Sequence, residues 1–360
     1  MAGAKSLMKS LQLLCRAALA MLVPVACFGA DPVADPLERP AMSSRHANAA
    51  FLLDIVRAGK RLVAVGERGT VLLSDDDGRS WRQARQVPVG VSLTRVAFPS
   101  AKSGWVVGHA GVVLASDDGG ETWSRRLDGY TAAAAALKAA QDALARRESA
   151  ANRQALWEAE RLVADGPDKP FLDLHFTTPQ RGFVVGAYGI IFRTEDGGKS
   201  WQAWMSHLEN PKGYHLNAIA AVEGVLYIAG EHGLVLRSTD GGEHFSTLKL
   251  PYEGSFFIAA PYGRKIVVGG LRGNAFVSED QGKSWKPLDV AMPVSLAHVA
   301  PLSGGGLLVI NQAGQALRGS GEGVRPLRMP PLPPLTAAVE AADGAIVAAT
   351  YRGPRRLPPP

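Results

Sequence analysis

The sequence predicts an all-β fold, because one eight-residue turn pattern recurs along the chain, an apolar hairpin precedes each copy, and glycine is abundant. The chain has 360 residues, of which 40 are glycine. Hydrophobic residues make up 46% and charged residues 20% of it, which are the proportions of an ordinary globular protein. This composition excludes disorder along the whole chain.

The first thirty residues have the pattern of an export signal. Basic residues precede an apolar run over positions 17–28, which is too short to span a bilayer. We therefore predict that residues 1–30 are a signal peptide and that the mature chain, without a membrane span, is periplasmic or secreted. The formal net charge of +6 includes Lys5, Lys9 and Arg16 of this segment, which has no acidic residue. The remaining charge is too small to predict nucleic-acid binding.

Both cysteines, Cys15 and Cys27, lie in the same segment. A chain cut beyond Cys27 forms no disulfide, so its stability comes from packing alone. Attachment of a lipid to Cys27 is the less favoured alternative, because Pro24 stands where lipoprotein signals usually carry leucine.

The repeated turn has the form Ser/Thr-x-Asp-x-Gly-x-x-aromatic, known as the Asp-box. Its five copies are SDDDGRSW from Ser74, SDDGGETW from Ser116, TEDGGKSW from Thr194, STDGGEHF from Ser238 and SEDQGKSW from Ser278. Successive copies lie about forty residues apart, apart from one longer interval. A unit of this length holds four short strands and their turns.

Each Asp-box follows a hairpin with a Gly-x-x-Gly turn between two apolar strands. The five hairpins are VAVGERGTVLL, WVVGHAGVVLA, FVVGAYGIIFR, LYIAGEHGLVLR and VVGGLRGNAFV, and LLVINQAGQALRG and AIVAATYRG lack the box. Seven four-stranded units that cannot bury both faces alone predict a ring, a seven-bladed β-propeller over residues 51–357. The last unit ends after its third strand. We expect the N-terminal segment 31–50, through part of residues 36–50, to supply the missing strand and latch the ring.

We expect the Asp-box to act in folding, because its carboxylate accepts turn N–H groups and its aromatic residue fills the blade. The residues with this predicted structural role are Asp76, Trp81, Asp118, Trp123, Asp196, Trp201, Asp240, Phe245, Asp280 and Trp285. No catalytic, cofactor-binding or metal-binding residue is predicted. The eight histidines are scattered along the chain without the spacing of metal ligands.

The long interval contains an insertion between blades two and three. Residues 130–166 are rich in Ala, Leu, Arg, Gln and Glu, which favour helix. The strands on either side belong to neighbouring blades, so the chain has to return. We therefore predict a helical hairpin that turns near residues 148–152 and rises from the face with the Gly-x-x-Gly turns.

That face is where we expect a partner to bind, because arginine and tyrosine, frequent anchors of protein interfaces, lie at its turns. The predicted partner-binding residues are Arg68, His109, Tyr188, His232, Arg272, Tyr351 and Arg352 at these turns, with Trp157 of the insertion. The alternative is that these side chains are only solvated hairpin tips.

With its five Asp-boxes and the recurring V-G-x-x-G phrase, the chain resembles the photosystem II stability/assembly-factor-like propellers, a family within the BNR/Asp-box repeat proteins. The resemblance covers residues 51–357. It implies a non-enzymatic, monomeric binding module without a cofactor. Its partner would be a membrane protein or complex subunit exposed in the periplasm or lumen. In a non-photosynthetic bacterium this partner could be a membrane transporter.

The alternative function is that of a sialidase-like glycoside hydrolase or a carbohydrate-binding propeller, since such proteins share the Asp-box. The chain lacks the Arg-Ile-Pro motif of sialidases. Glycosidases also need two facing carboxylates, and most acidic residues here belong to the boxes. The sequence therefore favours a binding protein.

Overall fold

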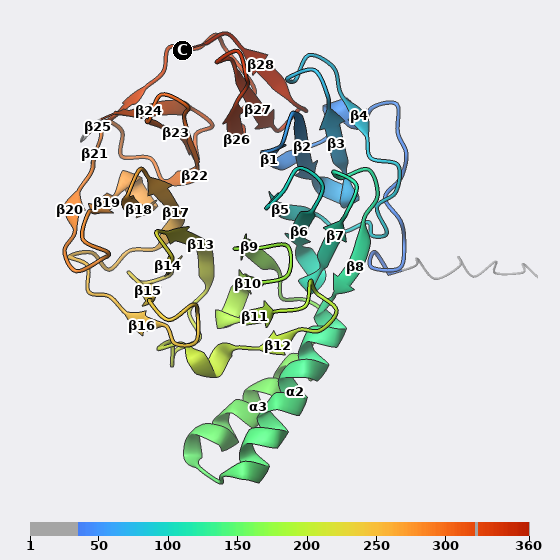
Figure 1. Ribbon diagram of the computed structural model, residues 1–360, viewed down its shortest axis with the longest axis vertical. Helices are drawn as coiled ribbons and strands as arrows, with labels where there is room; N and C mark the ends of the chain where they lie inside the picture. Colours follow the sequence, from blue (N-terminus) through green and yellow to red (C-terminus); the bar gives the residue numbers. More distant parts are fainter. Residues whose placement is uncertain (1–34, 321–322, 360) are drawn as a thin grey trace, which may run out of the picture. The chain divides into compact units, whose positions relative to one another are not determined.

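Strands and turns make up most of the computed structural model, which describes residues 35–320 and 323–359 (Figure 1). These residues form seven sheets and two α-helices, and the account below concerns the compact unit of residues 36–360. The prediction of an all-β chain is confirmed. The predicted signal peptide, 1–30, lies outside the described residues. No described helix is long and apolar enough to cross a membrane.

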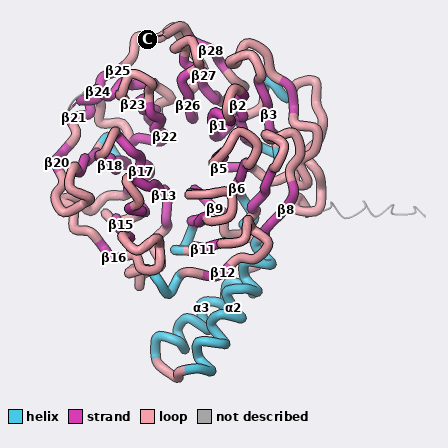
Figure 2. Tube along the Cα trace, viewed as in Figure 1, coloured by secondary structure: helices cyan, strands magenta, loops and turns pink. Residues whose placement is uncertain are grey.

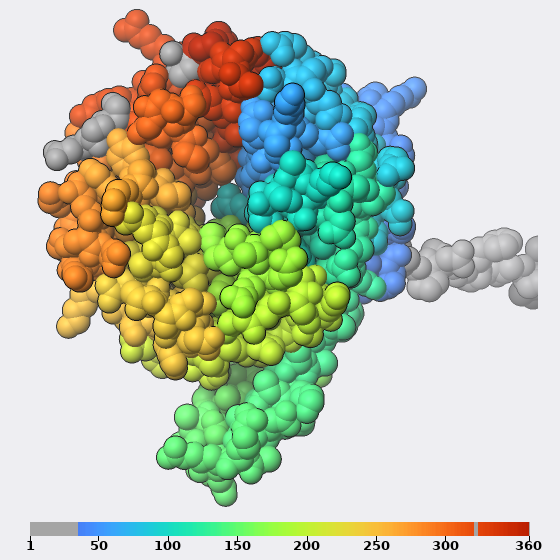
Figure 3. Space-filling view, in the orientation of Figure 1, coloured from blue at the N-terminus to red at the C-terminus, as the bar shows by residue number. Residues whose placement is uncertain are grey.

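The sheets, numbered 1 to 7 in chain order, are arranged around a central axis with the first strand of each regular sheet innermost (Figures 1 and 2). Every sheet packs on the next through its own hydrophobic cluster, and the cluster of Leu52, Ile55, Val347 and their neighbours joins sheet 7 to sheet 1. The space-filling view shows a hollow at the centre of the ring (Figure 3).

Five sheets have four antiparallel strands each. Sheet 1 contains β1 (Leu52–Ala58), β2 (Arg61–Gly66), β3 (Val71–Ser74) and β4 (Arg82–Gln83), and sheet 2 contains β5 (Leu93–Ala97), β6 (Gly104–Gly108), β7 (Val113–Ser116) and β8 (Ser124–Leu127). Sheet 3 contains β9 (Phe171–Phe176), β10 (Gly182–Gly186), β11 (Ile191–Thr194) and β12 (Gln202–Ala203), and sheet 4 contains β13 (Leu216–Val222), β14 (Val225–Gly230), β15 (Val235–Ser238) and β16 (Ser246–Thr247). Sheet 5 contains β17 (Phe256–Tyr262), β18 (Lys265–Gly270), β19 (Ala275–Ser278) and β20 (Lys286–Pro287).

The last two sheets depart from this plan. Sheet 6 contains β22 (Leu296–Pro301), β23 (Leu307–Asn311), β24 (Ala316–Ser320), β25 (Gly323–Pro326) and the short β21 (Asp289–Val290), which pairs with β25 in parallel. Sheet 7 contains β26 (Leu335–Glu340), β27 (Ile346–Thr350) and β28 (Arg355–Leu357).

The first glycine of each Gly-x-x-Gly turn lies against the innermost strand of its sheet. A Cβ atom on Gly66 would lie 2.1 Å from the carbonyl oxygen of Phe51, and one on Gly108 would lie 2.3 Å from that of Ser92. Beside this contact the register of the innermost strand shifts, as between Leu52 and Asp54. The same shift occurs in all seven innermost strands. In sheets 1 to 5 the glycine leaves room for this bulge, whereas Asn311 and Thr350 stand in its place beside the same bulge in sheets 6 and 7.

The Asp-box turn is closed by its own side chains. In the first copy, the Ser74 hydroxyl donates to Asp76 Oδ1 at 2.8 Å and accepts the Gly78 N–H at 2.8 Å. The Ser80 N–H also donates to Asp76 Oδ1, at 2.8 Å, and its hydroxyl donates to Oδ2 at 2.6 Å. The carboxylate therefore satisfies donors on both sides of the turn.

The other four boxes repeat this geometry around Asp118, Asp196, Asp240 and Asp280. Trp123, Trp201 and Phe245 are buried, whereas Trp81 and Trp285 are half-buried. The box glycine adopts a positive φ and touches the preceding sheet: a Cβ atom on Gly242 would lie 2.3 Å from the ring of Phe183. Each box thus also brings neighbouring sheets together.

The insertion forms two helices, α2 (Gly129–Arg146) and α3 (Ala150–Asp165), that follow β8. Asp128 begins α2 with a capping box, because its carboxylate accepts the Thr131 N–H at 2.9 Å while the Thr131 hydroxyl accepts the Asp128 N–H at 3.1 Å. Buried alanines of α2 pack against sheet 3. The pair extends outward from the ring (Figure 1), whereas we expected it to rise from one face.

The N-terminal segment differs from the expected latch. Residues 36–50 contain only the short 3-10 helix η1 (Ala47–Ala49), and no described residue outside β26–β28 pairs in sheet 7. Instead, Leu37 is buried between sheets 1 and 2. The Ala41 N–H donates to the Val87 carbonyl at 3.0 Å, and the Gly90 N–H donates to that of Pro36 at 2.7 Å. These contacts hold the first part of the segment beside sheets 1 and 2. Its last residue, Ala50, accepts the Gly353 N–H just before β28 at 2.9 Å, without forming a strand there.

We predict that Trp123→Ala lowers the free energy of unfolding by about 3–5 kcal/mol, because it empties a packed site between sheets 1 and 2. Trp123 is 3% exposed, and its indole N–H donates to the Gly120 carbonyl at 2.9 Å. Trp157 is 51% exposed, so Trp157→Ala should cost less than about 1 kcal/mol. Chemical denaturation of both variants measures this; equal losses would contradict the assigned packing.

The Asp-boxes also predict a loss of stability in acid. Hydrogen bonds, first from the serine near the end of the box, lower the pKa of Asp76, Asp196 and Asp280 from 3.8 to about 2. A carboxyl whose pKa is lowered by folding stabilises the native state above its unfolded pKa, and this contribution disappears as pH falls through the folded value. The free energy of unfolding should therefore fall between pH 3.8 and about 2.

Asp76→Asn should weaken this dependence on pH, because the amide does not titrate. Asp117→Asn is the matched control, since Asp117 lies in the second box but is exposed and makes none of the turn bonds around Asp118. Denaturation at a series of pH values measures the slope. An unchanged slope in Asp76→Asn would show that the box does not carry the effect.

Candidate functional site

The Gly-x-x-Gly tips lie on one face of the ring, beside the connections that lead from sheet to sheet. A Cβ atom on Gly69 would lie 2.1 Å from the carbonyl oxygen of Val89, and one on Gly233 would lie 2.4 Å from that of Tyr252. Val89 and Tyr252 belong to such connections. The Asp-box turns join the opposite ends of the antiparallel strands and lie on the other face. We call these the tip face and the box face.

Five tips share a backbone conformation that residues with a side chain rarely adopt. Their second residues are Arg68 (φ 53°), Ala110 (φ 56°), Tyr188 (φ 56°), His232 (φ 52°) and Arg272 (φ 56°). For an L-residue, the left-handed region costs roughly 1–2 kcal/mol. Glycine would be favoured at each of these positions, yet four of the five carry a large side chain.

Seven of the eight residues predicted to bind a partner are exposed on the tip face. They are Arg68, His109, Tyr188, His232, Arg272, Tyr351 and Arg352. Tyr188 and His232 belong to the neighbouring sheets 3 and 4, and the residues that they stack on, His215 and Tyr214, are adjacent in the chain. Trp157 lies elsewhere, on α3, where the guanidinium of Arg161 stands 4.9 Å from its ring.

Sheets 3 and 4 carry two stacks of aromatic and basic side chains on the tip face. In the first, Tyr188 lies between the Lys169 ammonium, 5.1 Å from its ring, and the His215 ring at 4.8 Å. In the second, Tyr214 stacks on His232 with ring centroids 4.6 Å apart. We call these side chains the aromatic stacks. They offer exposed ring faces together with hydrogen-bonding atoms, which suits the binding of a polypeptide.

Sequence reasoning missed Lys169, Lys212, Tyr214 and His215, because it considered only the hairpin tips. Lys212 lies 5.6 Å from the Tyr214 ring, in the connection that leads into β13. The signal was the run KGYH just before an innermost strand, since such a connection reaches the same face as the tips.

Two acidic tip residues have a structural role. Glu67 accepts the backbone N–H of Phe51 at 3.0 Å, and Glu231 accepts that of His215 at 2.9 Å. Glu231 also lies 2.8 Å from His215 Nδ1. These carboxylates hold the start of the innermost strand and are therefore less available to a partner.

The arginines of the tip face are free to bind. The guanidinium groups of Arg68, Arg272 and Arg352 make no hydrogen bond or ion pair within the part of the chain that the structure describes. An exposed guanidinium without a partner can donate to a carboxylate or a carbonyl oxygen of another chain. The face thus combines free cations with exposed aromatic rings.

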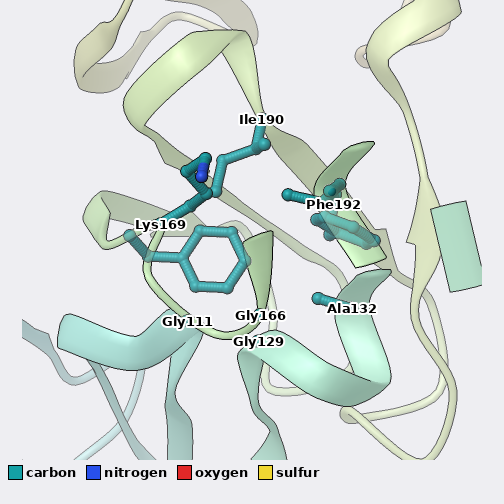
Figure 4. Close-up of a pocket in the computed structure, with 9 residues that line it drawn as sticks. Gly111, Gly129, Ala132, Gly166, Lys169, Ile190 and Phe192 are labelled. Carbon is teal, nitrogen blue, oxygen red and sulfur yellow. The ribbon is translucent and has the colours of Figure 1, made fainter. Parts of the chain in front are cut away.

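A small cavity lies where the helical hairpin meets sheets 2 and 3. Figure 4 shows its lining residues, among them Lys169, Ile190, Phe192 and Ala132. Its volume of about 10 Å³ holds at most one water molecule. Although burial opposes the charge, hydrogen bonds to Asp168 and Asp165 raise the pKa of Lys169. The cavity is a packing gap, and Lys169 is held at its edge beneath Tyr188.

A larger groove of about 540 Å³ runs between the N-terminal segment and sheet 1, lined by residues that include Arg45, Gln83 and Arg85. It is open and polar. Among residues 35–320 and 323–359, no group of three His, Cys, Asp or Glu side chains could hold a metal ion.

Two protein-family models match parts of the chain. A family model described as photosynthesis system II assembly factor YCF48 matches residues 149–255, which is well under half of the chain, and the BNR/Asp-box repeat model matches residues 114–125. A search of curated proteins found no match.

Among solved structures, one described as YCF48 bound to D1 peptide has a TM-score of 0.60 at 15% identity, over 89% of this chain and 96% of that chain. The WD40 β-propeller domain of Doa1 has a TM-score of 0.60 at 11% identity, over 89% and 96%. An ancestral GH74 enzyme has 0.60 at 11% identity, over 86% and 45%. At these identities the likeness shows a propeller-like fold. The family matches confirm that the chain resembles the photosystem II assembly factors and the BNR/Asp-box repeat proteins.

Proposed function

We propose that this chain is a non-enzymatic propeller that binds a segment of a membrane protein or complex on its tip face and acts as an assembly or stability factor. In this proposal the seven sheets are seven blades, and α2 with α3 is an insertion between blades two and three. Residues 1–30 direct export, and the mature chain works as a monomer in the periplasm or lumen. In a non-photosynthetic bacterium its partner is an exposed part of a membrane transporter.

The observation that carries the proposal is the set of large side chains in left-handed conformation. Arg68, Tyr188, His232 and Arg272 keep their side chains at a cost in folding stability that glycine would avoid. Backbone strain of this kind is found at binding sites, where the surrounding structure maintains it. A role in folding would favour glycine, so a role in binding is the better explanation.

The residue types on the tip face define the partner chemistry. Tyrosine and arginine contribute much of the binding energy in protein interfaces, because they combine a large contact area with directed hydrogen bonds. The free guanidinium groups suit an acidic or carbonyl-rich segment, and Tyr188 and Tyr214 suit apolar or proline side chains. Support at the level of the family comes from the solved relative, which is described as bound to a peptide.

The glycosidase alternative rests on the shared Asp-box and a shared fold. The two most buried carboxylates near the axis, those of Asp54 and Asp173, both lie close to Arg95, at 3.7 Å and 3.3 Å from its nitrogen atoms. Each also accepts backbone N–H groups. Carboxylates held in this way do not form the open pair, with space for a sugar between them, that hydrolysis requires.

Glycine substitutions at the tips test the proposal. Tyr188→Gly and Arg272→Gly should leave the free energy of unfolding unchanged or raise it by up to about 1–2 kcal/mol, because glycine relieves the backbone strain. Binding should nevertheless weaken by about tenfold or more, because the anchoring side chains are lost. The probe is an array of peptides from the exported segments of the source organism's membrane proteins.

Two matched controls separate the side chain from the backbone. Ala110→Gly changes the same left-handed position on the tip face without removing a large side chain, and Gln281→Gly changes a left-handed position (φ 59°) in a box turn. Both should bind the array as the unaltered chain does. Equal binding by Tyr188→Gly and Arg272→Gly would contradict the proposal, and release of sugar from a glycan panel would favour the alternative.

Trp157→Ala, measured on the same array, tests the contribution of the insertion. Trp157 belongs to α3, which extends outward from the ring together with α2 (Figure 1). A loss of binding in this variant would mean that a partner reaches around the edge of the ring. Unchanged binding would limit the site to the tip face.

A further inference from the structure

Four ionisable side chains from the innermost strands meet at the axis of the ring. They are Asp54 of β1, Arg95 of β5, Asp173 of β9 and His298 of β22. Each is the third residue of its strand and follows the shift of register described above. Asp54, Asp173 and His298 are at most 8% exposed. We call these four side chains the axial cluster.

Arg95 is the centre of the axial cluster. Its Nη1 lies 3.7 Å from Asp54 Oδ1 and 3.2 Å from His298 Nδ1, and its Nε lies 3.3 Å from Asp173 Oδ1. Asp54 and Asp173 belong to the sheets on either side of sheet 2, whereas His298 belongs to sheet 6. Arg95 therefore reaches across the axis to a sheet that is not its neighbour.

The direction of the hydrogen bonds on His298 follows from the charge of Arg95. A guanidinium can only donate, so His298 Nδ1 accepts and the ring proton lies on Nε2. His298 Nε2 lies 3.2 Å from the Ala338 carbonyl in sheet 7 and donates to it. His298 is thus neutral and links sheets 2, 6 and 7.

The two carboxylates link further sheets through backbone N–H groups. Asp54 Oδ2 accepts the Val96 N–H of sheet 2 at 2.9 Å, and Asp173 Oδ2 accepts the Ile219 N–H of sheet 4 at 2.8 Å. Burial raises the pKa of both carboxyls, and the positive charge of Arg95 acts against that rise. Removing one partner would leave a buried charge unpaired, which is strongly destabilising.

Within residues 35–320 and 323–359, no strand is shared by sheets 1 and 7, so other links join the ends of the ring. Between sheets 7 and 1, the Thr336 hydroxyl donates to the Leu52 carbonyl at 2.8 Å and Arg57 donates to that of Glu340 at 3.1 Å. The Gly353 N–H donates to the Ala50 carbonyl at 2.9 Å. These are separate contacts rather than a continuous ladder, and Arg57 is partly exposed. We call this boundary the seam.

We propose that the axial cluster closes the ring. Arg95 and His298 hold the first sheets to the sixth and seventh across the axis, and Asp54 and Asp173 fix Arg95 in the position that reaches His298. Closure then combines the hydrophobic cluster of the seam with a contact through the centre, in place of a strand shared by the first and last sheets. The seam is expected to open when the contact across the axis is lost.

His298→Leu is the informative substitution, because it removes the contact across the axis and leaves both carboxylates beside Arg95. Hydrogen exchange should rise by about tenfold in β1 and β26, which border the seam, while β13 and β17 on the far side keep their protection. His175→Leu is the matched control: His175 lies on the innermost strand β9, is half-buried, and its Nε2 has no hydrogen-bond partner. It should leave the seam unchanged.

Two further variants keep the proposal falsifiable if His298→Leu folds poorly. His298→Gln should retain protection at the seam, because its amide can accept from Arg95 and donate to Ala338. In a chain with Cys15 and Cys27 replaced by serine, Phe51→Cys and Tyr351→Cys allow a short thiol cross-linker across the seam, where the native rings lie 4.6 Å apart. Cross-linking should restore protection in His298→Leu.

The dependence of hydrogen exchange on pH gives a second test of the proposal. Burial, followed by the charge of Arg95, lowers the pKa of His298 from 6.5 to about 3, so the neutral form belongs to the closed ring. The contribution of His298 is full above pH 6.5 and declines as pH falls toward 3, because the opened state takes up a proton. Exchange at β1 and β26 should rise over this interval in the unaltered chain and less in His298→Gln.

Three outcomes would overturn the proposal. The first is an even rise of exchange over all innermost strands in His298→Leu, which would mean a general loss of stability. The second is a failure of the cross-link to restore protection. The third is an equal effect of His175→Leu, which would mean that any buried histidine has the same influence.

Discussion

A close approach between two backbone segments recurs in each of sheets 1 to 5. The first glycine of each Gly-x-x-Gly turn faces a carbonyl group at the start of the innermost strand, and on Gly230 a Cβ atom would lie 2.3 Å from the His215 oxygen. No side chain fits there, so the glycine is required. In these sheets the contact lies beside the bulge of the innermost strand. The residue after the bulge belongs to the axial cluster in sheets 1, 2, 3 and 6, and sheet 6 has Asn311 in place of the glycine.

Much of this fold can be predicted from the sequence because the repeat is local. The Asp-box and the Gly-x-x-Gly phrase each specify a turn, so they locate two of the four strands in five sheets. The helical insertion was expected over residues 130–166, and the two helices occupy Gly129–Arg146 and Ala150–Asp165. Helix-favouring composition, and the absence of Gly and Pro from residues 131–165, were sufficient for this prediction.

Contacts between distant residues could not be predicted in the same way. The latch was expected because the last unit lacks a strand, but burial of Leu37 between sheets 1 and 2 holds the N-terminal segment elsewhere. Asp54, Arg95 and His298 lie far apart in the chain, and only the register of the bulge shows that they share the axis. The aromatic stacks were missed because Tyr214 and His215 lie in a connection without a repeated motif.

The turns on the two faces of the ring differ in which residues adopt the left-handed backbone conformation. In the box turns, the Ser/Thr hydroxyl and the Asp carboxylate accept backbone N–H groups of the turn, and glycine occupies most left-handed positions. On the tip face, large side chains occupy left-handed positions although glycine would be more stable. Stability is thus concentrated on the box face, and the tip face retains side chains that a more stable ring would lack.

Among the strands that the structure describes, none is shared by sheets 1 and 7, and this affects the order in which the sheets can fold. Every sheet consists of one uninterrupted stretch of chain, so each can form as soon as its own residues have been synthesised. A sheet completed by the N-terminal segment would have to wait for the other end. Here the seam and the contacts of His298 with Asp54 and Arg95 join the first sheets to the last ones. Folding can therefore follow synthesis sheet by sheet, with closure of the ring as its last step.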